Sequence, residues 1–394
     1  MRRKILSPIL IATGICGGIS AYRLIGLLFS DYLYQKDFIQ FYLMGHALRA
    51  GSNLYAPLPE LGVQFDSNLH HWLAISAYPP IAAVIGLPFS FLPYFWAVTA
   101  WMIFELACLT LAIMLIVKHF GGRSASIPVL ITVCVFTAWH PVYFELFLGQ
   151  LMIPILLLLT LTWLALRTGR DVKAGLLLGI VLAIKLYAWP LALFCLLKGR
   201  WRVAVVAGSV FIALNVMMTA WTGSATTIDY YARVGPLVFA QYVNDPFNFS
   251  SWSIGYRALG TTGGLAVSLV VLGLSLLWAL RTDFETGFMM MLAAATILQP
   301  ISWIHYMITL LPVFCFIANR NNFRTAELIL VLFLTVLILP GFYPVAHTFV
   351  PMATWPPFIF IIGLMWLIMP KSVRGRSAIS TFAGDFPRQL RPSR

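Results

Sequence analysis

Long runs of apolar residues recur along the whole sequence, separated by short polar segments rich in lysine and arginine. A transmembrane helix needs about 17 to 25 mostly apolar residues, and the runs predict spans near residues 5–29, 96–117, 125–145, 149–166, 202–222, 262–281, 286–303, 305–319, 326–345 and 350–370. Two further segments, residues 78–93 and 174–197, contain prolines and fit no simple crossing, so we expect broken or re-entrant elements. The pattern predicts an all-α polytopic membrane protein with roughly 10 to 13 transmembrane or re-entrant helices.

Two long polar segments, residues 31–77 and 223–261, interrupt this pattern and are expected to form the main loops on one side of the membrane. Within the first loop, residues 38–48 place their aromatic and aliphatic side chains on one helical face, which predicts a helix lying in the interface. Gly51-Ser52-Asn53 should end that helix. We expect one transmembrane domain, residues 1–370, followed by a basic tail, residues 371–394.

Composition supports a membrane protein and charge gives its orientation. The chain is 60% hydrophobic, only 10% charged, and carries a formal net charge of +13. The basic residues gather in alternate loops and in the tail, a distribution typical of cytoplasmic segments and not of a nucleic-acid surface. We therefore expect a multi-pass protein of a bacterial inner or plasma membrane, with both termini cytoplasmic and both long loops on the periplasmic or extracellular side. The apolar run after Met1-Arg2-Arg3-Lys4 is too long for a cleaved signal peptide and predicts a retained helix.

Metal or disulfide chemistry is not indicated. The five cysteines all lie in apolar segments without paired spacing, which favours a packing role. His70 and His71 are adjacent and have no third ligand nearby in the sequence.

Polar residues from unrelated segments are instead predicted to meet on the outer side. They are Asp37, Gln150, Lys185, Asn248, Arg257 and His305. A carboxylate beside a lysine, an arginine and a histidine suits general-base chemistry on one substrate next to an anionic group on the other. Plainer interpretations remain open: Asp37 as a helix cap, with Asp31 as its nearest rival; Lys185 reaching toward headgroups; His305 as a structural histidine; and Arg257 as a surface lipid contact.

Several segments also resemble a known family. They are the run of residues 37–55, Tyr78-Pro79-Pro80 with Pro88 and Pro93, Gly149-Gln150, residues 174–185 ending in Lys185, residues 198–202, residues 248–257, and residues 299–305 ending in His305. In their order and spacing the chain resembles glycosyltransferase family 87, which has the GT-C fold. Ile304 and Tyr306 depart from the pattern, because the family often has an acidic residue and a second histidine at these positions.

The resemblance implies an inverting glycosyltransferase with Asp37 as the general base. It implies that Lys185, His305 and Arg257, with Gln150, Asn248 and Tyr78, bind the donor phosphate or the substrate. The donor would be a polyprenyl-phosphate-linked sugar, with mannose as the first candidate, and the acceptor a glycolipid or glycan beside membrane lipids. No metal and no other cofactor is implied.

A secondary transporter or a lipid-linked sugar flippase is the alternative, since transporters also contain broken helices and intramembrane charges. The absence of a repeat between the two halves, and the polar residues gathered at one face, favour the enzyme.

Overall fold

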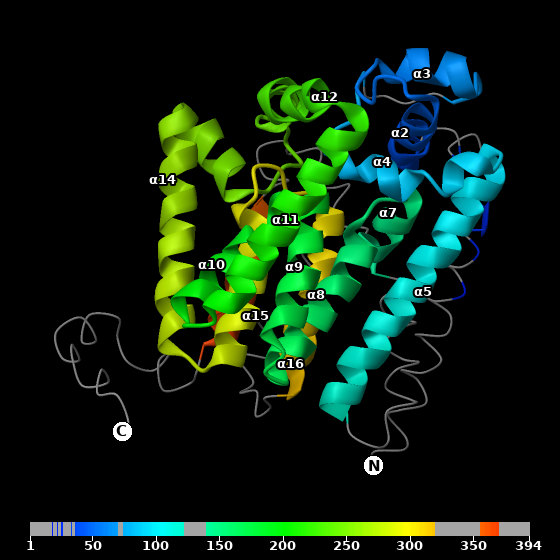
Figure 1. Cartoon of the computed structure of the whole chain (residues 1–394). Helices are drawn as coiled ribbons and strands as arrows, with labels where there is room; N and C mark the ends of the chain where they lie inside the picture. The colour runs from blue at the N-terminus through cyan, green and yellow to red at the C-terminus, as the bar shows by residue number, and fades with distance from the viewer. Residues whose placement is uncertain are drawn as a thin grey trace.

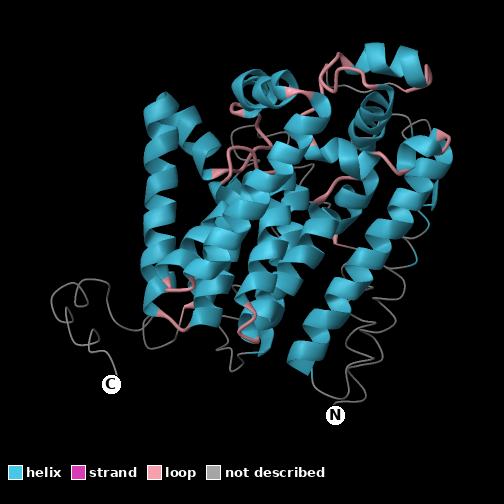
Figure 2. Cartoon of the chain, viewed as in Figure 1, coloured by secondary structure: helices cyan, strands magenta, loops and turns pink. Residues whose placement is uncertain are grey.

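The computed structural model describes residues 36–69, 74–121, 139–319 and 355–369, together with a few isolated positions before residue 36. Within these ranges the chain consists of helices and connecting loops, without strands (Figure 2). This confirms the predicted all-α membrane architecture.

Three of the described helices are long and apolar enough to cross a membrane: α5 (Tyr94–Gly121), α11 (Trp201–Thr222) and α14 (Ser251–Arg281). They match the predicted spans 96–117, 202–222 and 262–281. Figure 1 shows α5 and α14 at opposite edges of the bundle, with α11 and other helices between them. The helix α14 also extends into the second loop, where Leu259 and Gly260 leave helical geometry.

Shorter apolar helices occupy the positions of other predicted spans. They are α8 (Met152–Arg167), α15 (Phe284–Leu298), α16 (Leu311–Asn319), which follows a 3₁₀ helix η6 (Ile304–Leu310), and α19 (Trp355–Ile368). The predicted spans 5–29 and 326–345 and the tail 371–394 lie outside the described residues. Most of the predicted span 125–145 also lies outside the described residues. Its last residues belong to α7, which runs from His140 to Leu148.

The segment predicted to be re-entrant at residues 174–197 enters and leaves at the same end of the bundle. It consists of α9 (Asp171–Ile184), a 3₁₀ turn η4 (Leu186–Ala188) and α10 (Trp189–Leu197), broken at Lys185, whose backbone is extended. Arg200, just after α10, forms an ion pair with Asp171 at the start of α9. The two ends of the segment therefore meet, and Lys185 lies at the far tip.

The other predicted broken element is also confirmed as short helices that cannot span a membrane. Residues 78–93 contain α4 (Ile81–Gly86) and the 3₁₀ turn η2 (Phe89–Phe91). Together with α3 (Leu58–Phe65) they pack around α2 (Phe38–Ala50).

The helix α2 ends at Gly51, as predicted, because this residue adopts a left-handed conformation. The burial of α2 differs from the expectation that one face is buried and the other is exposed to solvent, since every side chain from Phe38 to Leu48 is buried. On the apolar side α4 crosses very closely: a Cβ atom on Gly86 would overlap the carbonyl oxygen of Phe41, and the absence of side chains at Gly45 and Gly86 permits this approach. The polar side is covered as well, because Gln40 accepts from the backbone N–H of Ala77 and the His46 ring stacks on Phe65 of α3.

Basic residues collect at one end of the bundle. Arg167, the last residue of α8, pairs with Glu285 at the start of α15 at 2.8 Å. Lys198 donates to the carbonyl oxygens of Leu280 and Thr282, where α14 ends. Gln150 precedes the first residue of α8, so it lies a 16-residue helix away from this basic end, about 24 Å.

Candidate functional site

A cavity of about 800 Å³ opens at the end of the bundle opposite the basic residues. Five of the seven predicted site residues line it: Asp37, Tyr78, Gln150, Lys185 and His305. The second loop closes another side of the cavity with η5 (Tyr230–Val234), a π-helical turn, and α13 (Gly235–Tyr242), which follow α12 (Ser224–Asp229).

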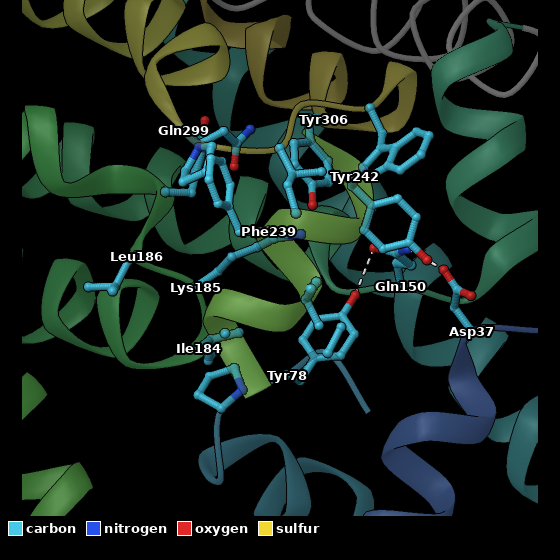
Figure 3. A pocket seen from close by; sticks show the side chains of 18 of the residues that line it. Asp37, Tyr78, Gln150, Ile184, Lys185, Leu186, Phe239, Tyr242, Gln299 and Tyr306 are labelled. Carbon is cyan, nitrogen blue, oxygen red and sulfur yellow. Dashed lines mark hydrogen bonds between the residues drawn. The ribbon is translucent and has the colours of Figure 1, made fainter. Parts of the chain in front are cut away.

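Gln150 joins three of these side chains through one amide. Its nitrogen donates a hydrogen bond to Oδ2 of Asp37. Its oxygen accepts from the Tyr78 hydroxyl at 2.7 Å and from Nε2 of His305 at 3.1 Å. Figure 3 shows Gln150 between Asp37 and Tyr78. The amide therefore holds the Asp37 carboxylate as a hydrogen-bond acceptor and fixes the His305 tautomer with the proton on Nε2.

Lys185 approaches the cavity from the opposite side (Figure 3). Its Nζ lies 3.8 Å from the ring centre of Tyr306 and 5.6 Å from that of Tyr78. Within the described ranges it forms no ion pair with a carboxylate. The ammonium group is thus held by aromatic faces, which attract a cation without neutralising it, and it can meet an anionic ligand.

Tyr306 is one of the two positions where the sequence departs from the family pattern. Its ring lies beneath Lys185 and next to His305, with ring centres 4.6 Å apart. Ile304, the other departure, is buried. Sequence reasoning did not assign Tyr306 a contact with Lys185.

Asn248 and Arg257 lie outside the cavity lining. The Asn248 side chain donates to the carbonyl oxygens of Tyr242 and Pro300 and accepts from the backbone of Ser250 and Ser302. Arg257 donates to the carbonyl oxygen of Asp245 at 2.9 Å. Both side chains thus hold the second loop in place, and Asn248 ties it to the segment that leads to His305. Their predicted binding roles remain predictions.

Two charged residues that sequence reasoning left aside set the geometry around Asp37. Lys36 donates to the carbonyl oxygens of Leu146 at 3.0 Å and Phe147 at 2.6 Å, which joins the first loop to the end of α7. Burial lowers the pKa of Lys36 to about 8. Because Lys36 adjoins Asp37, this contact fixes where the Asp37 backbone lies relative to α7.

Glu145 fixes the turn that carries Gln150. Its Oε1 accepts from the backbone N–H groups of Met152 and Ile153 and so caps the first turn of α8. Gly149 closes the turn in a left-handed conformation and packs against Phe38, where a Cβ atom would come within 3.0 Å. The side chain of Gln150 is thereby directed at the residue that precedes Phe38, which is Asp37. No sequence motif pointed to this cap.

The described ranges contain no group of three or more His, Cys, Asp or Glu side chains placed to hold a metal ion. His70 and His71 lie outside those ranges. The available chemistry in the cavity is that of two carboxylates, Asp37 and Asp245, an ammonium group, an imidazole, and several tyrosine and tryptophan rings.

Comparison with known proteins matches the model of glycosyltransferase family 87 to residues 77–340, about two thirds of the chain. A polyprenol-phosphate-mannose-dependent alpha-(1-2)-phosphatidylinositol pentamannoside mannosyltransferase of Mycolicibacterium smegmatis is 26% identical over 252 residues, which are 60% of this chain and 59% of the relative. An alpha-(1->3)-arabinofuranosyltransferase of Mycobacterium tuberculosis is 28% identical, over 57% of this chain and 51% of the relative.

A third relative, a polyprenol-phosphate-mannose-dependent alpha-(1-2)-phosphatidylinositol mannoside mannosyltransferase of Mycobacterium tuberculosis, is 26% identical over 79% of this chain and 75% of its own length. The chain spans only between half and three fifths of the length of the other two relatives. No significant match was found among solved structures. The family match covers well over half of the sequence and includes every cavity segment except the first loop. The chain therefore belongs to glycosyltransferase family 87.

Proposed function

We propose that the protein is a membrane glycosyltransferase that moves a sugar from a polyprenyl-phosphate-linked donor to a glycolipid or glycan acceptor, with inversion at the anomeric carbon. The observation that carries the proposal is the placement of Asp37 and Lys185 on opposite sides of one cavity, with Gln150 and Tyr78 between them (Figure 3). Family membership and the printed names of the relatives support the same reaction class.

Asp37 is proposed as the general base. The acceptor hydroxyl is a weak nucleophile until its proton is removed in the transition state. As the acceptor oxygen bonds to the anomeric carbon, its proton passes to Asp37 and the bond from that carbon to the phosphate oxygen breaks. Gln150 orients the carboxylate for this step through its hydrogen bond to Oδ2.

Lys185 and His305 are proposed to face the donor phosphate. When the phosphate leaves, it gains one negative charge, and a cation already in place stabilises that charge. Lys185 suits this role because aromatic rings contact its ammonium group and, among the described residues, no carboxylate forms a salt bridge with it. Attack on the face opposite the phosphate requires base and cation on opposite sides of the sugar, which agrees with their separation in the cavity.

The cavity is proposed to open on the non-cytoplasmic side. Cytoplasmic loops are enriched in lysine and arginine, and the described basic clusters lie at the other end of the bundle. Mannose is the first candidate for the donor sugar because two of the three relatives carry it in their names, and arabinofuranose is the competitor named by the third.

The test is sugar transfer by the purified full chain from polyprenyl-phosphate-mannose to a mycobacterial-type phosphatidylinositol mannoside acceptor. Asp37→Asn keeps an oxygen that can accept from Gln150 but cannot take up a proton, so the rate should fall at least about 100-fold. Donor affinity should change less than about tenfold, because Lys185 and His305 are untouched. Asp66→Asn, in the same loop but bonded to Asn68, is the matched control and should retain the wild-type rate.

Near-normal turnover of Asp37→Asn would remove Asp37 from the role of base. Vectorial movement of the lipid donor across a liposome membrane without any covalent product would instead support the transporter alternative.

A further inference from the structure

A second cavity of about 500 Å³ lies at the basic end of the bundle, where α9 and α11 begin. It is lined by Arg170, Asp171, Lys173, Leu176 and Arg202, among others. The start of α9 and the start of α11 therefore contribute to one pocket, at the opposite end of α9 from Lys185.

The pocket carries uncompensated positive charge. Among its described lining residues one is a carboxylate, that of Asp171, and it pairs with Arg200. Arg170, Lys173 and Arg202 are exposed, and none of them forms an ion pair in the part of the chain that the structure describes. Other basic residues at this end differ, since Arg167 pairs with Glu285 and Lys198 is bound to two carbonyl oxygens.

Both helices also start at this pocket without a side-chain cap. The residues before them, Arg170 for α9 and Arg200 for α11, form no capping hydrogen bond. N–H groups that no cap side chain satisfies, together with the helix dipoles at these termini, add to the attraction of an anion.

Apolar side chains in the pocket and next to it in the sequence are exposed. Val172, which lines the pocket, is 55% exposed, and Trp201 and Val205, in the first turns of α11 that also carry Arg202, are 55% and 54% exposed, although the same helix pair is tightly packed at Gly175 and Gly179. The helix α11 is long enough to cross a membrane, and only 17% of its apolar window is buried inside the protein, so its outer surface faces lipid. The Arg202 guanidinium lies 5.6 Å from the Trp201 ring centre, an arrangement suited to the headgroup level of a bilayer.

We propose that this pocket binds an anionic phospholipid. The headgroup phosphate would lie among Arg170, Lys173 and Arg202, and the acyl chains would run along the exposed apolar surface of α9 and α11. A soluble phosphate would satisfy the charges but would leave Val172, Leu176 and Val205 without a partner, so the occupant is a lipid. Basic pockets between helices on this side of membrane proteins recognise lipid headgroups by these interactions. The site is separate from the proposed catalytic cavity and does not depend on the reaction assigned to it.

The test is native mass spectrometry of the full chain, released from detergent with added phosphatidylglycerol or phosphatidylcholine. The double variant Lys173→Gln/Arg202→Gln should bind phosphatidylglycerol about 30-fold more weakly than wild type, since each basic residue near an anionic headgroup contributes about a fivefold gain. The matched control Lys118→Gln/Arg281→Gln removes the same charge from the ends of α5 and α14, outside the pocket, and should bind as wild type does.

Thermal unfolding without added lipid checks that both variants are folded, and only the wild type and the control should gain stability when phosphatidylglycerol is added. Equal losses of binding in the pocket and control variants would show diffuse attraction to the basic end and overturn the site. Equal binding of phosphatidylcholine, or full displacement by soluble glycerophosphate, would overturn the assignment to an anionic lipid.

Discussion

The hydrogen bonds of Gln150 predict a measurable coupling between two cavity residues. Gln150→Leu removes the acceptor of the Tyr78 hydroxyl and of the His305 Nε2 proton, and the donor to Asp37. Tyr78→Phe removes only the hydroxyl and keeps the ring that packs against Phe41 at 4.5 Å between ring centres. The two substitutions therefore act on the same hydrogen bond from its two ends.

The expected magnitudes follow from burial. Tyr78 is 6% exposed and His305 1%, so each donor left without an acceptor costs about 1–3 kcal/mol. Gln150→Leu should thus lower the free energy of unfolding by about 2–6 kcal/mol, and Tyr78→Phe in the wild-type chain by about 0.5–1.5 kcal/mol. In the Gln150→Leu background, Tyr78→Phe removes a hydroxyl that has already lost its acceptor, so it should cost nothing or restore stability. The cycle should give a coupling of about 0.5–4.5 kcal/mol.

The assay is denaturant or thermal unfolding in one detergent, together with initial rates of sugar transfer for all four proteins. Gln299→Leu is the matched control, because Gln299 lines the same cavity but its amide donates to the carbonyl oxygen of Thr296. Its effect should add to that of Tyr78→Phe within about 0.5 kcal/mol. If Gln150→Leu and Tyr78→Phe were also additive, the Tyr78–Gln150 hydrogen bond would have no energetic role and Tyr78 would not hold the Gln150 amide in place.

Three further predictions test the site and its surroundings. Lys185→Met should reduce sugar transfer at least about 100-fold while changing the melting temperature little, because within the described residues the ammonium group forms no salt bridge that its removal would break; equal losses of both would assign Lys185 a structural role. Burial lowers the pKa of His46 from 6.5 to about 4, so the contribution of this residue to stability should be constant above about pH 6.5 and fall toward pH 4 by no more than about 3 kcal/mol. Between these pH values His46 is protonated in the unfolded chain but not in the folded chain. The substitution His46→Gln should therefore flatten the dependence of stability on pH, and an unchanged dependence would contradict the assignment to His46. A cysteine introduced by Ser52→Cys should react with an impermeant thiol reagent in intact cells, whereas one introduced by Thr168→Cys at the basic end should react only after lysis, and the reverse pattern would invert the proposed orientation.

The sequence predicted the elements wherever length and composition alone decide them. The spans at 96–117 and 202–222 correspond to α5 and α11 within a few residues, since a long apolar run has no other stable conformation in a membrane. The break at Lys185 was also predictable, because a charge followed by Trp189-Pro190 cannot continue an apolar helix.

The contacts that position the site could not be predicted in the same way. Lys36 reaches the carbonyl oxygen of Leu146, 110 residues away, and Gln150 meets Asp37 across 113 residues. Neither contact leaves a periodic pattern in the sequence, because each depends on how α7 and the first loop pack. The all-round burial of α2 had a weak signal in Gly45 and Gly86, but small residues mark a close helix crossing only once their partner is known.

The groups that contact Lys185 indicate that it serves function and not stability. A lysine that serves stability inside a membrane protein is expected to have a carboxylate near it, because burying an ammonium group without one is costly. Lys185 forms no salt bridge within the described residues and contacts two tyrosine rings, with its Nζ 3.8 Å from the centre of Tyr306. Ring faces hold a cation in position while leaving its charge available. Tyr306 departs from the usual residue of the family, and its uncharged ring holds the ammonium group in position. A second charged side chain at this place would repel or neutralise that group. An anionic substrate that enters the cavity would complete an ion pair that the protein itself leaves open.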